Sequence, residues 1–301
     1  MQKKSEFELF CARDNLLFKQ EDGIWRFLLP ERESHYARFI RDYETVRRFE
    51  GRFSPDASYY RALPFKDTSG KFSADWRIRA ASFRALQKIL TAESTVLDVG
   101  AGNGWLSNRL SLGGHNVCAV DLLLNPEDGL GAWSHYQSQF TRTQSEFIHL
   151  PFLTASVSTV IFNASFHYSE NYEESLTESL RVLSPNGKVI IMDSPIYHNA
   201  DSGEQMVAER KSAFLSRYGF ASDSLRSENY LTYRRMEELG KTLGIVWRHI
   251  RPLYGVRWRL RPWLAHLRGR REPAEFGLWV GMRAICATIS YFPYIFKDFE
   301  F

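Results

Sequence analysis

The residues whose types and spacing point most clearly to chemistry lie near the middle of the chain, around a cluster of glycines. They are Asp98, Gly100, Gly102, Gly104 and Asp121. Glycines allow the backbone to turn sharply, and they let a ligand approach the main-chain N–H groups that open the following helix. The sequence therefore predicts a loop that binds a ligand, with an acidic side chain before it and another after it.

The acidic residues indicate what kind of ligand this loop would bind. The dinucleotide-binding pattern has a third glycine three residues after the second, but here that position is Trp105. A carboxylate at Asp98 would repel a pyrophosphate and suit a cationic group. Asp121 follows 23 residues later, where an acid can accept hydrogen bonds from the two hydroxyls of a ribose. An adenosine ligand with a positive group and no phosphates fits these features.

The elements that must position these residues alternate along the chain. Apolar runs at 95–99, 117–120, 157–162 and 188–192 predict strands buried on both faces, and helical patterns at 105–112, 130–139 and 173–183 separate them. Two more strands are expected at 244–250 and 276–282, with a basic helix between them. This order predicts an α/β fold with a doubly wound sheet, mainly parallel, and an antiparallel C-terminal strand.

At the glycine loop the chain resembles the cofactor loop of class I S-adenosylmethionine-dependent methyltransferases, in the style of the ubiquinone/menaquinone-biosynthesis branch. The resemblance extends from residue 91 to 282. It includes Leu-Pro-Phe at 150–152, Asn-Ala-Ser-Phe-His-Tyr at 163–168 and Ser-Pro-Asn-Gly at 184–187. It implies a Rossmann-like methyltransferase sheet and S-adenosyl-L-methionine as the cofactor. The chain departs from the family at Ser158, where Asp is common, and at Glu146, which replaces a more usual Asp.

The resemblance also implies which residues meet the cofactor. Asp98 and the three glycines would hold its amino-acid part, Asp121 its ribose, Leu122 the adenine face and Glu146 the adenine amino group. The full set of expected contacts is Asp98, Gly100, Ala101, Gly102, Gly104, Asp121, Leu122, Glu146 and Asn163.

The methyl acceptor is less well defined by the sequence. A general base is needed only where the acceptor must lose a proton, and the candidates are His167 and Tyr168, which follow the fourth strand of the fold. A purely structural hydrogen bond is an equal alternative for His167. Residues 163–166 lack the Pro-Pro pair that grips a planar amine, which disfavours methylation of an exocyclic base nitrogen. Cys118 is expected to point into the core, which disfavours cytosine-carbon methylation.

The shared motifs divide the chain into three parts: an N-terminal extension or lid at 1–90, the methyltransferase domain at 91–285 and a hydrophobic tail at 286–301. The extension is expected to help form the acceptor pocket. No metal is expected, because Cys11, Cys118 and Cys286 form no zinc-binding pair. A membrane span at 276–296 is disfavoured by Arg283 near its middle, so no transmembrane span is expected, and the few scattered cysteines favour the cytoplasm.

Composition excludes collagen-like, disordered and low-complexity classes, with 301 residues that are 44% hydrophobic and 25% charged. The net charge of +4 is too small to indicate a nucleic-acid binder. The segment from Arg248 to Arg271, however, holds eight arginines and no acid. Val256, Leu260, Leu264 and Leu267 repeat there at helical spacing, so one buried face is expected. The arginines could stay solvated, or contact an anionic surface or, less readily, nucleic acid.

These observations favour an S-adenosylmethionine-dependent methyltransferase that acts on an oxygen or carbon of a small-molecule or lipid-like acceptor. Two alternatives stay open: an RNA methyltransferase that uses residues 248–271, and a non-catalytic module that binds S-adenosylmethionine.

Overall fold

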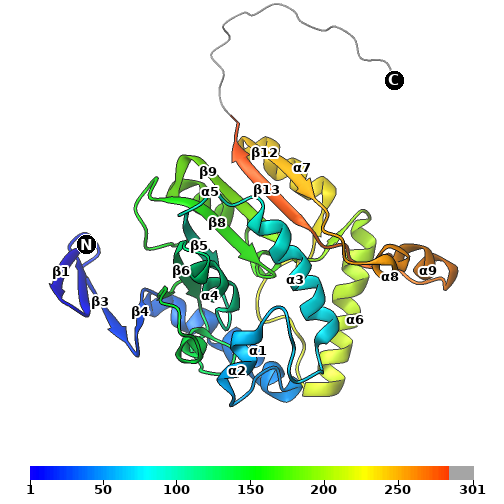
Figure 1. Cartoon of the computed structure of the whole chain (residues 1–301), viewed down its shortest axis with the longest axis horizontal. Coiled ribbons are helices and arrows are strands. Elements are labelled where there is room, and N and C mark those ends of the chain that lie inside the picture. Colours follow the sequence, from blue (N-terminus) through cyan, green and yellow to red (C-terminus); the bar gives the residue numbers. More distant parts are fainter. Residues whose placement is uncertain (285–301) are drawn as a thin grey trace, which may run out of the picture.

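The computed structural model describes residues 1–284, so the predicted tail at 286–301 and Cys286 lie outside the described residues. Within residues 1–284, one sheet has the strand order β1-β2-β3-β4-β7-β6-β5-β8-β9-β13-β12 (Figure 1). Its strands are β1 (Gln2–Ser5), β2 (Glu8–Cys11), β3 (Leu16–Glu21), β4 (Ile24–Arg26), β5 (Thr95–Val99), β6 (Asn116–Asp121), β7 (Thr141–Gln144), β8 (Val157–Asn163), β9 (Leu183–Met192), β12 (Ile245–Ile250) and β13 (Leu278–Arg283).

The predicted fold class is confirmed by the pairing of these strands. The central strands β7, β6, β5, β8 and β9 run parallel to one another, whereas β13 is antiparallel to both β9 and β12. At the other edge of the sheet, β1 to β4 pair with one another in antiparallel fashion. The two short strands β10 (Ile196–Tyr197) and β11 (Leu231–Thr232) form a separate parallel pair. A mainly parallel sheet places the ends of its strands along one edge, where loops from several strands can meet.

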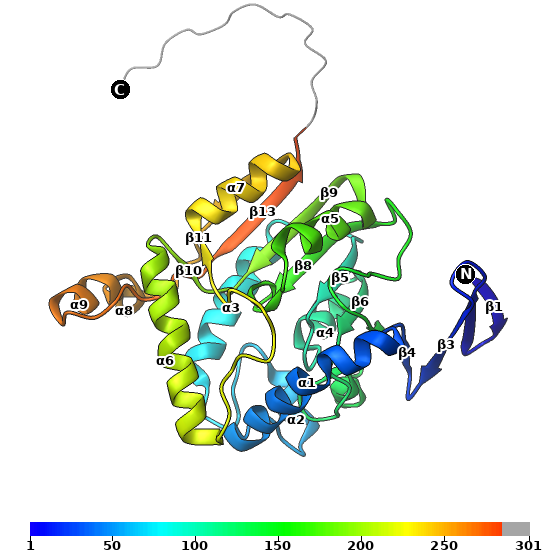
Figure 2. The same ribbon diagram turned by 180° about the vertical axis from the view of Figure 1, so that it is seen from behind.

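Helices cover both faces of the central strands, which explains why these strands are apolar throughout (Figures 1 and 2). The helices are α1 (Pro30–Glu50), α2 (Ala57–Ala62), α3 (Ser73–Gln87), α4 (Trp105–Leu112), α5 (Tyr172–Val182), α6 (Ala200–Tyr218), α7 (Tyr233–Leu243), α8 (Val256–Arg259) and α9 (Arg261–Leu267). Neighbouring residues of β5 belong to two different hydrophobic clusters, one on each face of the sheet. Val96 packs with Trp105 of α4, and Leu97 packs with Leu176 of α5.

Most predicted elements of the central sheet and its helices lie where expected, with three differences among them. The helix expected at 130–139 is a short 3-10 helix, η1 (Leu130–His135). The strand β9 begins at Leu183 instead of Lys188, and its register against β8 shifts there. The strand β7 was not expected at all, because its sequence, Thr-Arg-Thr-Gln, is polar. It forms because it is paired on both sides, with β6 and with β4.

The N-terminal extension is joined to the same sheet. Trp25 of β4 pairs in parallel with Thr143 of β7, so β1 to β4 continue the sheet beyond its methyltransferase-like part. Arg109 of α4 donates hydrogen bonds to the carbonyl oxygens of Arg61 and Leu63, at 2.6 Å each. The extension therefore packs against the expected domain through both its strands and its helices.

The basic segment corrects one prediction. In place of a helix with a buried face, it contains α8 and α9, and neither has a buried residue. Val256, Leu260 and Leu267 are exposed to solvent. Helical spacing gave these side chains a common face, but no other described element covers that face.

The stretch at 276–296 is described only as far as residue 284, and this part contains β13, as the strand prediction required. Across residues 1–284, none of the helices has the length and apolar character needed to cross a membrane.

Candidate active site

A cavity of about 840 Å³ opens beside the carboxyl ends of β5, β6 and β8. Six residues singled out from the sequence line it: Gly100, Gly102, Asp121, Leu122, Glu146 and Tyr168. They come from four loops and from the end of β6, and α1 supplies the opposite wall through Arg32, Tyr36 and Tyr43. The parallel sheet thus brings together residues that are far apart in the sequence.

The glycine loop has the backbone geometry that only glycine adopts without strain. Gly100, Gly102 and Gly104 have φ values of +75°, +55° and +75°. The nearest atom to a Cβ placed on Gly102 is the carbonyl oxygen of Asp128, at 3.6 Å. A Cβ on Gly100 would lie only 2.3 Å from Cβ of Ser165. Gly100 is therefore required by the fold, while Gly102 leaves open space that a ligand can fill.

Asp121 lies at the end of β6 with its carboxylate held in a fixed orientation. Its two oxygens accept hydrogen bonds from the backbone N–H groups of Gly102, at 2.7 Å, and Leu123, at 2.8 Å. Burial raises the pKa of Asp121 to about 6. Each oxygen keeps a lone pair, so the carboxylate at the cavity wall can still accept hydrogen bonds from a ribose diol.

Asp98 lies beneath the loop and does not line the cavity. One carboxylate oxygen accepts a hydrogen bond from Ser107 Oγ at 2.7 Å, and the other has no partner among the described residues. Burial raises the pKa of Asp98 to about 7, and the nearby charge of Asp121 acts in the same direction. One acceptor oxygen of Asp98 thus stays without a partner. Direct contact between Asp98 and a cationic ligand group stays a prediction.

The Glu146 carboxylate has more hydrogen-bond partners within the protein than the sequence suggested. Arg32 Nη2 and the Tyr36 hydroxyl both donate to Oε2 of Glu146 at 2.7 Å, and Nδ1 of His149 lies 2.7 Å from Oε1. Burial alone would raise the pKa of Glu146, but the hydrogen bonds from Arg32, His149 and Tyr36 hold it below its usual range. Helix α1 is thereby fastened to the loop that is expected to meet adenine.

The other expected cofactor contacts lie outside the cavity wall. Ala101 and Asn163 are buried, and the Oδ1 atom of Asn163 has no partner among the described residues. Gly104 donates its N–H to the carbonyl oxygen of Ala101 at 3.0 Å and begins α4. These residues shape the loop from behind, and direct contact from them stays a prediction.

The structure separates the two catalytic candidates. His167 is buried, and its Nδ1 atom lies 3.3 Å from Oγ of Ser194. It lines neither this cavity nor the smaller one described below. Burial lowers the pKa of His167 to about 3, and the charges of Arg210 and Arg79 act in the same direction. Tyr168 lines the cavity and packs against Phe39 and Tyr43 of α1, at ring-centroid distances of 5.9 and 6.1 Å.

A second cavity of about 170 Å³ lies beside the first, between α1 and α6. It shares Phe39, Tyr43 and Tyr168 with the first cavity. Ser224 and Leu225 also line both cavities. The remaining wall combines apolar side chains, including Val46, Phe214 and Phe220, with the charged residues Asp42, Arg47, Glu50 and Arg210. The two cavities thus adjoin at side chains that line both of them.

The sequence did not single out the residues that α1 contributes. Tyr36, Phe39 and Tyr43 repeat at helical spacing, which predicted a helix but gave no sign that their face borders the cavities. Arg47 forms an ion pair with Asp128, including a 3.0 Å contact between Nη2 and Oδ1. Among residues 1–284, no group of three or more His, Cys, Asp or Glu side chains is placed to hold a metal ion.

Known proteins are similar to the middle part of this chain. Residues 97–191 match the family model of a methyltransferase domain. Malonyl-[acyl-carrier protein] O-methyltransferase from Erwinia pyrifoliae is 34% identical over 95 residues, which are 32% of this chain and 35% of that protein. The match thus spans only about a third of that relative's length. An uncharacterized methyltransferase from Staphylococcus carnosus is 24% identical over 157 residues, 52% of this chain and 72% of that protein.

Among solved structures, the fold is similar to a chain from the complex between the Haloferax volcanii Trm112 methyltransferase activator and a methyltransferase. The TM-score is 0.51 at 16% sequence identity, covering 71% of this chain and 92% of that chain. The strand order, the glycine loop, the acid at the end of β6 and the family-model match agree with one another. Residues 97–191 therefore contain a methyltransferase domain, in a fold similar to that of the class I, S-adenosylmethionine-dependent methyltransferases.

Proposed function

We propose that this protein transfers a methyl group from S-adenosylmethionine to an oxygen or carbon of a small-molecule or lipid-like acceptor. The observation that carries the proposal is the pair of adjoining cavities that share Phe39, Tyr43 and Tyr168. A ligand in the larger cavity and another in the smaller one would meet across these side chains. Such contact is what a transfer reaction between two bound molecules requires.

The residues of the larger cavity fit the cofactor. Asp121 would orient the ribose, and the open side of Gly102 would admit the amino-acid part next to backbone N–H groups. When bound, S-adenosylmethionine supplies an electrophilic methyl group. The protein's own contribution is then to hold the acceptor in line with that group and to exclude water, and α1 provides a wall that serves both purposes.

The smaller cavity supports an amphiphilic acceptor. Phe214, Phe220 and Val46 offer apolar contact, whereas Arg210 donates only to Ser222 Oγ, at 3.0 Å, and has no acidic partner among the described residues. Asp42 differs from Arg210, because its Oδ2 atom forms no hydrogen bond but lies 3.5 Å from Nε of Arg38 in an ion pair. An acceptor with an apolar body could pack against the apolar side chains, and a polar or anionic group on it could bind Arg210. The family-model match ends at residue 191, before α6, so the part of this wall that α6 contributes lies outside the matched region.

Tyr168 is the residue we place at the acceptor. It lines both cavities, so its hydroxyl can orient an acceptor oxygen. The similarity to an enzyme named as an O-methyltransferase supports an oxygen acceptor. We assign His167 a positioning role through Ser194, because its ring is buried away from both cavities.

The test has two stages. Calorimetry with S-adenosylmethionine should show binding by the wild type and loss of binding by Asp121→Ala. The protein is then incubated with cofactor bearing a deuterated methyl group and with small-molecule, lipid and RNA fractions of a cell extract. Label in a small molecule or lipid, reduced in Tyr168→Phe, supports the proposal. Label in RNA alone would establish the RNA methyltransferase, and tight cofactor binding without any labelled product would establish the non-catalytic module.

A further inference from the structure

An arm formed by residues 253–270, which contains α8 and α9, projects from the body of the protein beside α6 (Figures 1 and 2). Its apolar side chains are strongly exposed. The exposed fractions are 88% for Leu253, 73% for Val256, 46% for Leu260, 60% for Trp263 and 61% for Leu267. Contiguous apolar side chains left open to water mark a surface that has a partner.

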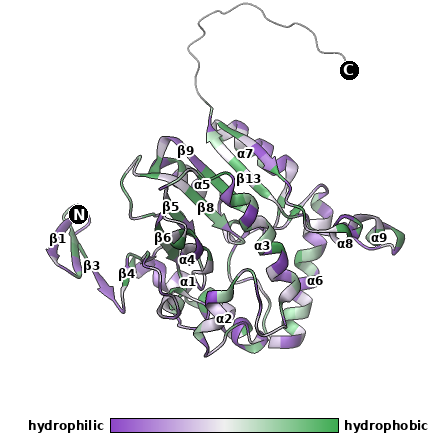
Figure 3. Cartoon of the chain, viewed as in Figure 1, coloured by the Kyte–Doolittle hydropathy of each residue, from purple (hydrophilic) through white to green (hydrophobic). Residues whose placement is uncertain are grey.

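The charge of the arm indicates what kind of partner it would bind. The arm contains five arginines and no acidic residue. Four of them, Arg257, Arg259, Arg268 and Arg270, are exposed and form no ion pair with any residue in the range 1–284. Hydrophobic and hydrophilic residues alternate along α8 and α9 (Figure 3). The surface is therefore both apolar and cationic, which is complementary to an anionic surface with an apolar layer beneath it.

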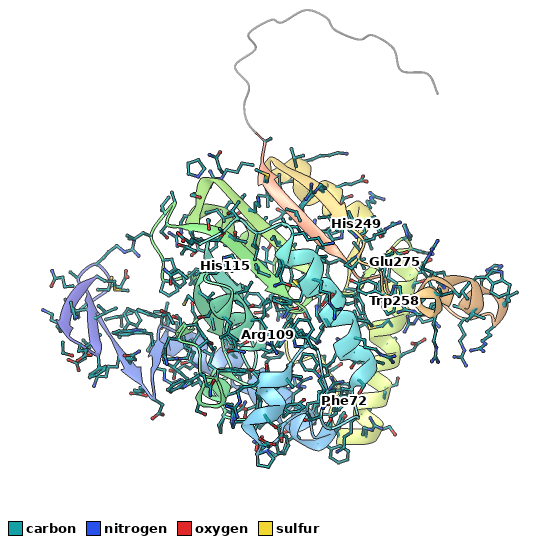
Figure 4. All side chains as sticks on the ribbon, viewed as in Figure 1. Phe72, Arg109, His115, His249, Trp258 and Glu275 are labelled. Atoms are coloured by element: carbon teal, nitrogen blue, oxygen red, sulfur yellow. The ribbon has the colours of Figure 1, made fainter. Side chains whose placement is uncertain are left out.

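The arm is fixed at its base, so these side chains are not exposed merely because the segment is loose. Trp258 stacks on Phe276 at 5.4 Å, and the guanidinium of Arg261 lies 3.5 Å from the centre of the Trp258 ring. Figure 4 labels Trp258 and Glu275 where the arm joins the body. The Tyr254 hydroxyl lies 2.9 Å from Ser82 Oγ on α3.

The base of the arm is also joined to the wall of the smaller cavity. Arg271 Nε, directly after the arm, lies 2.9 Å from Oε2 of Glu209 on α6. The next residue of α6, Arg210, lines the smaller cavity. A surface bound by the arm would thus lie next to the helix that forms one side of that cavity.

We propose that the arm docks the protein onto an anionic membrane surface. Leu253, Val256 and Trp263 enter the level of the lipid headgroups, and the four unpaired arginines contact lipid phosphates. Nucleic acid would satisfy the arginines but would give the aliphatic side chains no apolar layer. The docking does not depend on the proposed reaction, since it requires neither cavity to be occupied.

The test is cosedimentation of the full chain with vesicles of phosphatidylcholine alone, or with phosphatidylserine added. The charge variant replaces Arg257, Arg259, Arg268 and Arg270 with Gln. The matched control replaces four exposed arginines elsewhere, Arg13, Arg61, Arg77 and Arg234, with Gln. A third variant carries Leu253→Ser and Val256→Ser. Melting temperatures establish that every variant is folded.

We expect binding that needs phosphatidylserine. It should fall at least about tenfold in the charge variant, because each arginine near such a surface contributes roughly fivefold. The control should bind like the wild type, and the Ser variant should bind more weakly. Adding anionic vesicles should shift tryptophan fluorescence to shorter wavelength in the wild type, and less so in Trp263→Phe. Equal binding to neutral vesicles, an equal loss in the control, binding to RNA with none to vesicles, or a dimer that the Ser variant abolishes would each overturn the proposal.

Discussion

Replacing Gly102 with Ala should weaken cofactor binding while leaving the protein folded, whereas the same change at Gly100 should damage the fold. Both glycines have positive φ, so an alanine at either position carries a conformational penalty of about 1–2 kcal/mol. A Cβ on Gly102 meets no described atom closer than 3.6 Å, so this penalty is the whole expected cost. The new methyl group would instead occupy space at the cavity wall that the cofactor needs.

At Gly100 a second cost is added. The new Cβ would lie 2.3 Å from Cβ of Ser165, and Ser165 is held in place because its Oγ donates to the carbonyl oxygen of Val99 at 2.6 Å. Overpacking of this kind costs roughly 1–3 kcal/mol. The total for Gly100→Ala is then about 2–5 kcal/mol, against about 1–2 kcal/mol for Gly102→Ala.

Urea unfolding and calorimetry with S-adenosylmethionine measure the two effects separately. Gly102→Ala should unfold cooperatively with a small loss of stability and bind the cofactor at least about tenfold more weakly, equivalent to about 1.4 kcal/mol. The reasoning is refuted if Gly102→Ala binds with wild-type affinity, because the loop would then not approach the cofactor. It also fails if Gly100→Ala is as stable as Gly102→Ala.

Three further predictions concern groups with shifted pKa values. Asp121, whose pKa is raised to about 6, must be ionised to accept hydrogen bonds from the ribose hydroxyls. Cofactor affinity should therefore fall by up to about tenfold per pH unit below pH 6. In calorimetry, Asp121→Asn should bind the cofactor weakly, and its affinity should depend less on pH. The raised pKa of Asp98 means that the folded protein binds the carboxyl proton of Asp98 more tightly than the unfolded chain does. This contribution to the free energy of unfolding is fully present below about pH 4 and is lost as the pH rises through about 7. Melting curves of Asp98→Asn should therefore decline less between pH 5 and 8 than those of the wild type, and an identical decline would contradict the burial of this charge. The pKa of His167 is lowered to about 3, so the pH profile of kcat should show no step near pH 6.5. His167→Gln should keep the wild-type pH profile. A step near pH 6.5 that disappears in His167→Gln would instead identify His167 as the general base.

The features that the sequence predicted well are local ones. The apolar strand before the glycines, the loop and the helix from Trp105 are encoded within about twenty consecutive residues, so spacing alone identifies them. The parallel order of the strands follows from alternation with helices. The acid at the end of β6 could be placed in the site for the same reason, because parallel strands end at one edge of the sheet.

The features that the sequence missed depend on contacts between distant segments. Strand β7 is polar and exists because β4 and β6 pair with it from both sides. Arg32 reaches Glu146 across 114 positions of sequence, and no pattern around either residue announces the pair. The exposed face of α8 and α9 was mistaken for a buried one, because helical spacing shows which side chains share a face but not what covers it.

Helix α1 connects the N-terminal extension to the cofactor site at two places. Arg32, near its start, binds Glu146 in the loop after β7, and Arg47, near its end, binds Asp128 in the loop after β6. The acidic partners of both pairs are buried. Breaking one partner of such a buried pair leaves an uncompensated charge and costs about 3–5 kcal/mol. Both loops carry predicted cofactor-binding positions, so we expect the orientation of α1 and the occupancy of the cavity to stabilise each other.

This coupling predicts that S-adenosylmethionine slows amide hydrogen exchange in α1 as well as in the loops it contacts. Coupling between two sites is reciprocal, so Arg47→Met, which loosens α1, should both reduce that protection and weaken cofactor binding, by roughly 5–150-fold. Arg41→Met is the control on the same helix. The Arg41 side chain is 69% exposed and lines neither of the two cavities described above, and its contact with Asp42 is longer, at 3.7 Å between Nε and Oδ1. If the cofactor protects only the glycine loop and the ends of the central strands, α1 is a fixed wall and the coupling is absent. If Arg41→Met weakens binding as much as Arg47→Met does, the effect comes from lost helix stability and not from the ion pair with Asp128. Protection that spreads to α1 and depends on Arg47 would instead mean that the extension closes over the cofactor, which is the role the sequence assigned to residues 1–90.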